Sequence, residues 1–289
     1  MRYLIYLIAY PLLWCISMLP FSLLYLFSDF VYLIVYYIIG YRKETVRENL
    51  ALAFPNLSPK ERLVIEKKSF RHLCDMFLEM IKTMTISKNE IQKRFVFTNM
   101  EVYKKLEEQD KSIAMMLAHY ASYEWVISMN AYVNFSAFAI YKRISNPYFD
   151  KLVRDIRSKF KASLITTKQS ISVIINNKRN KKLSIYGFAS DQTPKVTSAF
   201  HWQTFMGVKV PVHTGAEVLA KKYNMNVIFL KVKKVKRGFY EASFEVLSEN
   251  AKEIPNYEIT DHFLKLVEQQ IYEAPEYYLW THKRWKHKE

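Results

Sequence analysis

The chain has 289 residues, 50% of them hydrophobic, and its 43 Lys and Arg against 27 Asp and Glu give a net charge of +16. Its two cysteines, Cys15 and Cys74, form no Cys-x-x-Cys pair and its histidines are scattered, so we expect no disulfide scaffold, no metal and no cofactor. None of the five glycines belongs to a phosphate-binding loop, which disfavours nucleotide binding. Basic runs at 178–182 and 231–236 match no nucleic-acid module, so we expect no nucleic-acid partner.

The N-terminus is the first predicted element. Residues 3–27 are apolar apart from two serines, and they are long enough to span a bilayer. Residues 30–39, after Asp29, form a second apolar run that is too short to span alone. We expect residues 1–40 to be a membrane anchor with one spanning helix over 3–27. The second run would lie in the membrane interface or pack on the following domain; a helical hairpin is the alternative.

The distribution of charge predicts the orientation in the membrane. Arg42, Lys43 and Arg47 follow the apolar region, whereas only Arg2 and the amino terminus precede it. Because cytoplasmic flanks are enriched in Lys and Arg, we expect a single-pass protein of the inner membrane with residues 41–289 on the cytoplasmic side. The net positive charge of that part favours an anionic partner. Simple adhesion to acidic lipid is the alternative.

A long amphipathic helix follows the anchor. Ser58-Pro59-Lys60-Glu61 has the form of a capping box with proline at the first helical position. Apolar residues then repeat at helical spacing as far as Met84, which predicts one helix over 58–84.

The rest of the chain alternates between short apolar runs and helical patterns. This rhythm predicts the α/β class: one domain over 41–289 with a central, largely parallel sheet flanked by helices. The expected strands are 95–98, 113–118, 136–141, 163–166, 183–188, 226–233 and 240–247, with a turn at Arg237-Gly238 between the last two. The expected helices are 120–132, 147–160, 170–176 and 260–272, the last of them capped by Thr260.

One histidine lies at the end of an expected buried strand. His119 follows the strand at 113–118, and Glu124 comes five residues later, near the start of the next helix. Ligands of open α/β sheets bind at this carboxyl edge. A neutral imidazole accepts a proton from a hydroxyl, and a carboxylate on its other nitrogen fixes the tautomer and stabilises the imidazolium. The two side chains can meet only if His119 lies in the turn before the helix, since five helical residues place them about 140° apart. An unrelated surface His and Glu are the alternative.

Further short motifs accompany this pair in a fixed order. They are Arg47-Glu48-Asn49-Leu50, Phe54-Pro55, Tyr141-Lys142-Arg143, Asn146-Pro147, Asp150, Arg157, Asp191-Gln192, Phe205, Gly207, Thr214-Gly215 and residues 275–285. From about Arg42 to Lys286 the chain resembles the bacterial lipid A late acyltransferases, the lauroyl/myristoyl transferase family within the H-x4-D/E acyltransferase group. It departs from that family at Tyr277, which is usually Gln, and at 121–123, where Gly-Asn-Trp is common.

The resemblance implies transfer of a fatty acyl chain from an acyl carrier protein thioester to a hydroxyl of a lipid A precursor. His119 would be the general base, and Glu124 would orient its imidazole. Backbone amides after His119 would receive the developing oxyanion, and Arg157 would bind that oxyanion or a substrate phosphate. An acyl-enzyme is not expected, because Ser122 lies in no Gly-x-Ser-x-Gly turn.

Other residues of these motifs are candidates for substrate binding, each with a structural alternative. Arg154 either shares the face of Arg157 or is solvated. Asn146 either starts a helix or lies beside the pocket, and Tyr141 belongs to the same motif. Asp191 either holds Arg157 or caps a turn.

The C-terminal motif also has two interpretations. Arg284 is a candidate substrate-binding residue that would lie at the membrane interface with Trp280 and Trp285, since tryptophan favours the headgroup level. Alternatively, these residues form a packed C-terminal lock.

Two other functions remain open from the sequence. The motif indicates the reaction better than the acceptor, so an aminolipid or a glycerophospholipid could replace the lipid A precursor. A protein of another class, a non-catalytic membrane protein that binds anionic lipid through its basic surface, would carry the same charge.

Overall fold

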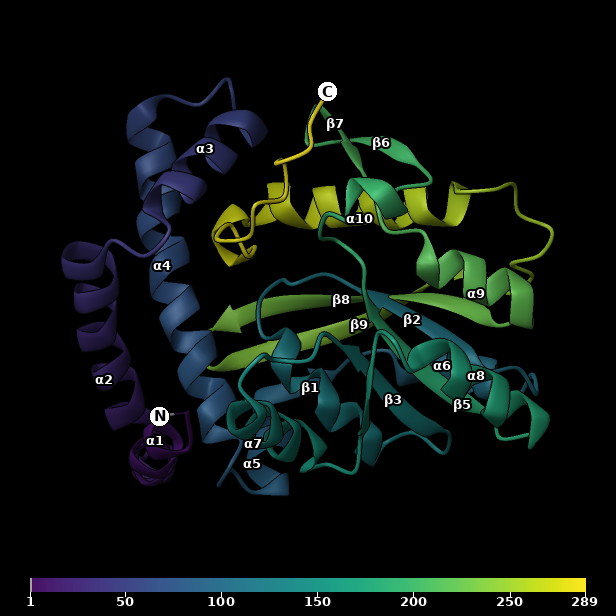
Figure 1. Cartoon of the computed structure of the whole chain (residues 1–289), viewed down its shortest axis with the longest axis horizontal. Helices are drawn as coiled ribbons and strands as arrows, with labels where there is room; N and C mark the ends of the chain where they lie inside the picture. Colours follow the sequence, from purple (N-terminus) through teal and green to yellow (C-terminus); the bar gives the residue numbers. More distant parts are fainter. Residues whose placement is uncertain (1) are drawn as a thin grey trace.

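The computed structural model describes residues 2–289, which form a mixed α/β arrangement. Its strands are β1 (Phe95–Phe97), β2 (Ile113–Leu117), β3 (Ser136–Tyr141), β4 (Ser163–Thr166), β5 (Ser184–Ala189), β6 (Trp202–Phe205), β7 (Val208–Pro211), β8 (Asn226–Lys236) and β9 (Phe239–Ser248). The large sheet has the order β1-β9-β8-β2-β5-β3-β4, and every neighbouring pair in it is parallel except β8–β9 (Figure 1). The predicted α/β class with a central, largely parallel sheet is confirmed, as is the turn at Arg237-Gly238. The short β6–β7 hairpin was not predicted.

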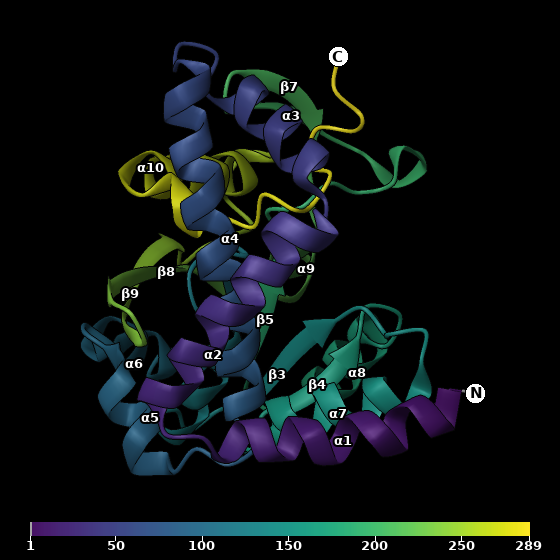
Figure 2. The same cartoon turned by 90° about the vertical axis from the view of Figure 1, so that its left-hand side faces the viewer.

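Helices surround this sheet. They are α1 (Arg2–Met18), α2 (Phe21–Leu33), α3 (Lys43–Ala53), α4 (Pro59–Lys82), α5 (Lys88–Arg94), α6 (Met100–Glu107), α7 (Pro147–Ser158), α8 (Ser170–Arg179), α9 (Gly215–Tyr223) and α10 (Glu258–Glu273). A π-helix, η1 (Ile34–Ile39), prolongs α2, and a 3₁₀ helix, η2 (Tyr123–Ala131), follows β2. The helices α9 and α10 lie over one side of the sheet and α7 lies on the other (Figures 1 and 2).

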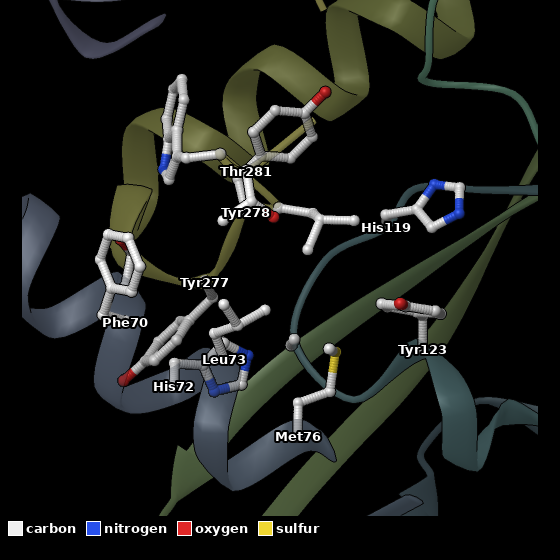
Figure 3. A pocket seen from close by; sticks show the side chains of 13 residues that line it. Phe70, His72, Leu73, Met76, His119, Tyr123, Tyr277, Tyr278 and Thr281 are labelled. Atoms are coloured by element: carbon white, nitrogen blue, oxygen red, sulfur yellow. The ribbon is translucent and has the colours of Figure 1, made fainter. Parts of the chain in front are cut away.

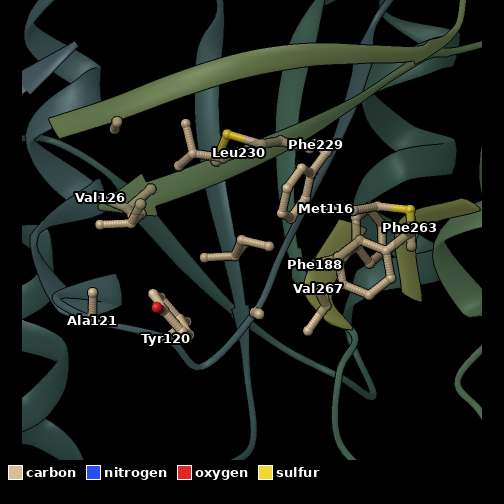
Figure 4. Packing of buried hydrophobic residues seen from close by; sticks show 14 of the residues in the cluster. Met116, Tyr120, Ala121, Val126, Phe188, Phe229, Leu230, Phe263 and Val267 are labelled. Carbon is tan, nitrogen blue, oxygen red and sulfur yellow. The ribbon is translucent and has the colours of Figure 1, made fainter. Parts of the chain in front are cut away.

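The central strand β2 runs through the hydrophobic core. All of its residues are buried, as expected for a parallel strand that is covered on both faces. Met116 lies in register with Phe188 of β5 on one side and with Phe229 of β8 on the other. Phe263 of α10 packs edge-on against Phe229, with 5.7 Å between the ring centroids (Figure 4). This packing fixes the end of β2, where the candidate site begins.

The N-terminal helices differ from the expected single span. The first helix ends at Met18 because Pro20 has no N–H to continue the ladder and disfavours a helical conformation for Leu19. The expected helix over 3–27 is therefore wrong. The segment with the length and composition to cross a membrane is Phe21–Ile39, which comprises 19 residues of α2 and η1. Both α1 and α2 lie on one side of the molecule, which faces the viewer in Figure 2.

The two predicted helix caps have different outcomes. The capping box of α4 is present, because the Ser58 hydroxyl accepts from the N–H of Glu61 and the Glu61 carboxylate accepts from the N–H of Ser58. The cap expected at Thr260 is wrong, since α10 begins two residues earlier. The carboxylate of Glu217 in α9 accepts from both the N–H and the hydroxyl of Thr260. A side chain from another helix therefore satisfies this helix start.

Candidate active site

Two neighbouring parallel strands end at the same edge of the sheet and position the site. The strand β2 leads into His119. The strand β5 pairs with β2 as far as Leu117 and Ala189 and leads into Asp191. The N–H of Ser190 donates to the carbonyl of Leu117, which keeps the two strand ends together. His119 therefore lies at the carboxyl edge of the sheet, as the sequence indicates.

Asp191 is the hydrogen-bond partner of His119. Nδ1 of the imidazole lies 2.7 Å from Oδ1 of Asp191, and the carboxylate is buried. Burial alone lowers the pKa of His119, but the charge and hydrogen bond of Asp191, together with the charge of Glu124, outweigh it and hold this pKa above its ordinary value. Burial also disfavours the charged form of Asp191, which raises its pKa. The charge and hydrogen bond of His119 outweigh this effect and bring the pKa of Asp191 below its ordinary value. Because the carboxylate accepts from Nδ1–H, the free lone pair of the imidazole lies on Nε2. In this tautomer Nε2 can accept a proton and act as a base.

Glu124 has a different partner from the expected one. Its carboxylate is buried and forms a two-point ion pair with Arg157 in α7, with distances of 2.8 Å from Nε to Oε2 and 2.5 Å from Nη2 to Oε1. Burial lowers the pKa of the Arg157 guanidinium, but the charge and hydrogen bonds of Glu124 outweigh it and raise this pKa. Glu124 lies in the first turn of η2, as a contact with His119 requires, but its carboxylate bonds Arg157 of α7 instead. The expected role of Glu124 in orienting the imidazole is thus corrected: Asp191 holds His119, and Glu124 acts on it through its charge.

The turn after His119 is held by the C-terminal part of the chain. Ala121 adopts a left-handed backbone with φ 49°, which reverses the chain between β2 and η2. Its N–H donates to the carbonyl of Tyr277, and the N–H of Leu279 donates to the carbonyl of His119. The N–H of Tyr120 donates to the carbonyl two residues back. The amides of Tyr120 and Ala121 are therefore already engaged and do not serve as oxyanion donors.

A narrow pocket opens beside His119 and runs towards α4 (Figure 3). Its lining side chains nearly fill it in this structure, and the cavity that remains has a volume of about 20 Å³. Tyr123 lies edge-on to the imidazole, with 4.9 Å between the ring centroids, and forms one wall. Leu73 and Met76 of α4 lie between His119 and the farther residues Phe70, His72 and Tyr277 (Figure 3). The other lining residues are Ser69, Ala121 and 278–281. The pocket thus joins a polar end at His119 to a largely apolar end at α4.

The motif before α7 is held together locally. Asn146 caps α7, because its Oδ1 accepts from the N–H of Tyr148 at 3.1 Å. The Tyr141 hydroxyl donates to the buried carboxylate of Asp150 at 3.2 Å, and Arg154 lies 3.6 Å from the same carboxylate. Tyr141, Asn146 and Arg154 therefore gather at the start of the helix that carries Arg157. The helix-start interpretation of Asn146 is confirmed.

The C-terminal motif is packed inside the protein. Trp280 and Trp285 are 1% and 3% exposed, and their rings stack at 5.9 Å. The membrane-interface interpretation is therefore wrong, and the packed lock is confirmed. Arg284 is also buried: its Nη1 donates to the carbonyl of Pro211, and its guanidinium lies over the ring of Phe205. Its Nε and Nη2 have no partner among the residues that the structure describes.

Some site features were missed from the sequence. Tyr123 lies between His119 and Glu124 in the sequence, so its position in the H-x4-E motif is a local indication that it lies close to the imidazole. Leu73 and Met76 belong to the apolar pattern of α4, which indicates burial but not a pocket. The partner of Asp191 had no local signal. Within residues 2–289 no group of His, Cys, Asp and Glu has the arrangement of metal ligands.

Together these features define an α/β protein in which a His–Asp pair and a Glu–Arg pair lie beside a narrow pocket. Residues 1–287 match the family described as bacterial lipid A biosynthesis acyltransferase, and the chain belongs to this family. It is an acyltransferase of lipid A biosynthesis, as the sequence motifs indicate. The chain is similar to the lipid A biosynthesis lauroyltransferase of Escherichia coli (strain K12). The two are 22% identical over 286 residues, which cover 99% of this chain and 92% of that relative.

Proposed function

We propose that this acyltransferase moves a fatty acyl chain from the thioester of an acyl carrier protein to a hydroxyl of a lipid A precursor, at the cytoplasmic side of the inner membrane. Membership of the family supports the lipid A precursor as acceptor. The net charge of +16 suits both a phosphorylated glycolipid and an acidic carrier protein. The apolar N-terminal helices support attachment to the membrane.

The hydrogen bond between His119 and Asp191 is the observation that carries the mechanism. With Nδ1–H held by Asp191, Nε2 of His119 removes the proton of the acceptor hydroxyl as its oxygen attacks the thioester carbonyl. Asp191 stabilises the imidazolium that forms. The C–S bond then breaks, and the imidazolium returns the proton to the departing thiolate. A positioned base of this kind contributes roughly 10²–10⁴-fold to the rate.

Arg157 is the proposed cationic group of the site. The Glu124 carboxylate accepts hydrogen bonds from Nε and Nη2 of Arg157 and so positions the guanidinium. The third nitrogen, Nη1, can then bind the oxyanion or a substrate phosphate. Glu124 is therefore a positioning residue, and Tyr141, Asn146 and Arg154 support it by fixing the start of α7. Arg284, with two nitrogens that lack a protein partner, is the second candidate for an anionic substrate group.

The pocket is the proposed place of the acyl chain. A thioester carbonyl beside His119 would direct its hydrocarbon tail past Tyr123 towards Leu73 and Met76, and the lining side chains would have to move apart to admit it. Apolar lining suits a chain that has no hydrogen-bonding group, because transfer of its methylenes out of water is favourable.

Mass spectrometry of lipid A tests the function in cells. We expect a strain without the gene to lose one acyl chain from lipid A, and the wild-type gene but not His119→Ala to restore it. Unchanged lipid A in a strain without a redundant enzyme would favour an aminolipid or glycerophospholipid acceptor. Restoration by His119→Ala would contradict the mechanism and favour a non-catalytic lipid-binding role.

A further inference from the structure

The second helix packs along α4 over its whole length. One stripe of α2 and η1 is buried against the domain, formed by Leu24, Ser28, Tyr32 and Tyr36. Three side-chain hydrogen bonds join the two helices in antiparallel order: Tyr36 to Glu66 at 2.8 Å, Ser28 to Asp75 at 2.7 Å and Tyr25 to Glu79 at 2.8 Å. Polar groups of α4 therefore bond the apolar segment Phe21–Ile39 at three positions along its length.

The tip of the β8–β9 hairpin reinforces this contact. Arg237 pairs with Asp29 of α2 at 2.8 Å and with Asp75 of α4 at 2.7 Å. The neighbouring Gly238 lies so close to α2 that a Cβ there would collide with the Tyr25 hydroxyl. Asp29 is the sole acidic residue before Glu44, and Arg237 offsets its charge. A hairpin of the central sheet thus reaches the middle of the apolar segment.

The first helix is tied to the domain as well. Nζ of Lys82 in α4 donates to the carbonyls of Ser17 and Leu19 at the end of α1, at 2.8 and 2.7 Å. Near the start of α1, Tyr6 stacks on Tyr148 of α7 with 5.6 Å between the ring centroids. Both N-terminal helices are therefore fixed against the domain.

The outward faces of these helices are apolar. In Figure 2 both helices lie across the face of the molecule that is turned to the viewer, and each runs along that face. The exposed large hydrophobic residues are Tyr3, Leu4, Ile5, Leu7, Ile8, Tyr10, Leu12, Trp14 and Met18 from α1, and Leu23, Leu26, Phe30, Leu33, Tyr37, Ile38, Ile39 and Tyr41 from the second helix and its end. Such a continuous surface requires an apolar partner.

A bilayer-spanning orientation does not fit these contacts. Since α4 runs beside α2, a membrane crossed by α2 would also contain α4 and the tip of the β8–β9 hairpin. Charged residues of α4 that are open to solvent, such as Lys68 and Arg71, would then enter the hydrocarbon. Charged side chains at that depth are costly and rare. The polar contacts instead favour a helix that lies parallel to the membrane surface.

We propose that α1 and α2 lie flat in the cytoplasmic leaflet of an anionic phospholipid membrane as an in-plane anchor, and that neither helix crosses the bilayer. The outward Trp14 and tyrosines suit headgroup depth, and Arg42 and Lys43 at the end of the anchor suit acidic lipid. The orientation of the anchor does not depend on the acyl donor. The helix α4, which supports the anchor, also lines the pocket through Leu73 and Met76. A lipid substrate would then reach the site from the leaflet surface.

Cysteine labelling in spheroplasts distinguishes the two orientations. Single cysteines replace Leu4 and Met18, which are both exposed, in a Cys15→Ser background that keeps the buried Cys74. Lys104→Cys, on the exposed surface of α6, shows on which side of the membrane the domain lies. We expect a membrane-impermeant maleimide to label none of the three in spheroplasts and all three after detergent is added. Labelling of Leu4→Cys and Met18→Cys in spheroplasts, with Lys104→Cys protected, would show that α2 crosses the membrane and would overturn the proposal.

Vesicle flotation of the purified protein tests the apolar face itself. Ile8 of α1 and Ile171 of α8 are both isoleucines exposed on helices, 69% and 53% respectively. We expect Ile8→Glu to reduce the fraction bound to phosphatidylglycerol-containing vesicles at least tenfold, while Ile171→Glu leaves that fraction unchanged. Equal binding of both variants and the wild type would contradict the proposed anchor.

Discussion

His119 and Asp191 lie 72 residues apart in the chain, yet Nδ1 of one and Oδ1 of the other are 2.7 Å apart. The contact exists because β2 and β5 are neighbours in the parallel sheet and end at the same edge. A carboxylate in this position selects the tautomer of the imidazole and stabilises its charged form. The reaction that we propose therefore depends on a pair that the sheet assembles.

Removal of the Asp191 charge should slow acyl transfer. Asp191→Asn retains the size of the side chain but neither enforces the Nδ1–H tautomer nor stabilises the imidazolium, so we expect kcat to fall about 10²–10⁴-fold. The matched control is Asp261→Asn, because Asp261 lies 2.8 Å from His201 in a second His–Asp pair outside the pocket. Steady-state rates of the purified variants provide the measurement. Equal rates for the two variants would contradict the role of Asp191.

The pH dependence of kcat/KM should report the same pair. Because the net shift raises the pKa of His119 above its ordinary value of 6.5, the base becomes protonated as the pH falls through that raised pKa. We expect an acid limb with a midpoint above 6.5. In Asp191→Asn the midpoint should move to lower pH, since the charge that raises the pKa is lost. An acid limb that stays in place in the variant would assign it to another group.

The ion pair between Glu124 and Arg157 should be coupled energetically. Glu124→Gln leaves the Arg157 guanidinium without a counter-charge, and Arg157→Gln leaves a buried carboxylate unpaired. Loss of one partner of a buried pair costs about 3–5 kcal/mol; we expect about 2–3 kcal/mol because the Arg157 side chain is 24% exposed. Denaturant unfolding of both single variants and the double variant gives a double-mutant cycle. Strict additivity would show that the pair does not stabilise the fold as a unit.

The α4 wall of the pocket should select the acyl chain length. Met76→Trp narrows the pocket at α4, so we expect a shift towards shorter acyl donors, whereas Met76→Ala should allow longer ones. Competition between acyl carrier proteins that bear chains of different length, read by mass spectrometry of the product, measures the preference. The control is Phe77→Trp, because Phe77 is the next residue of α4 but is 48% exposed and lies outside the pocket. An unchanged preference in both Met76 variants would place the chain elsewhere.

The sequence predicts the local elements better than their partners. Apolar runs and a capping box are local signals, and they identify the parallel strands and α4. The neighbours of β2 depend instead on how the whole core packs, so the motif at Asp191 was recognised without its contact to His119. The H-x4-E motif at a strand–helix junction predicts that Glu124 meets the imidazole. Glu124 does lie in the first turn of η2, but the packing of α7 brings Arg157 to its carboxylate.

Two errors at the ends of the chain have different causes. Pro20 is a local signal for the end of the first helix, although the apolar stretch continues past it to Phe27. The burial of Trp280 and Trp285 had no local signal, because tryptophan occurs both at membrane interfaces and in cores. Their burial follows from the return of the C-terminal segment over the turn at His119.

Acyl transfer by the purified protein tests the central claim most directly. Wild-type enzyme, His119→Ala, an acylated carrier protein and a lipid A precursor are combined, and the mass of the lipid is measured while circular dichroism confirms that both proteins are folded. The account predicts that the wild type adds the mass of one acyl chain to the lipid and that His119→Ala adds it at least about 100-fold more slowly. Transfer at an equal rate by folded His119→Ala, or no transfer by the wild type to this acceptor, would contradict it.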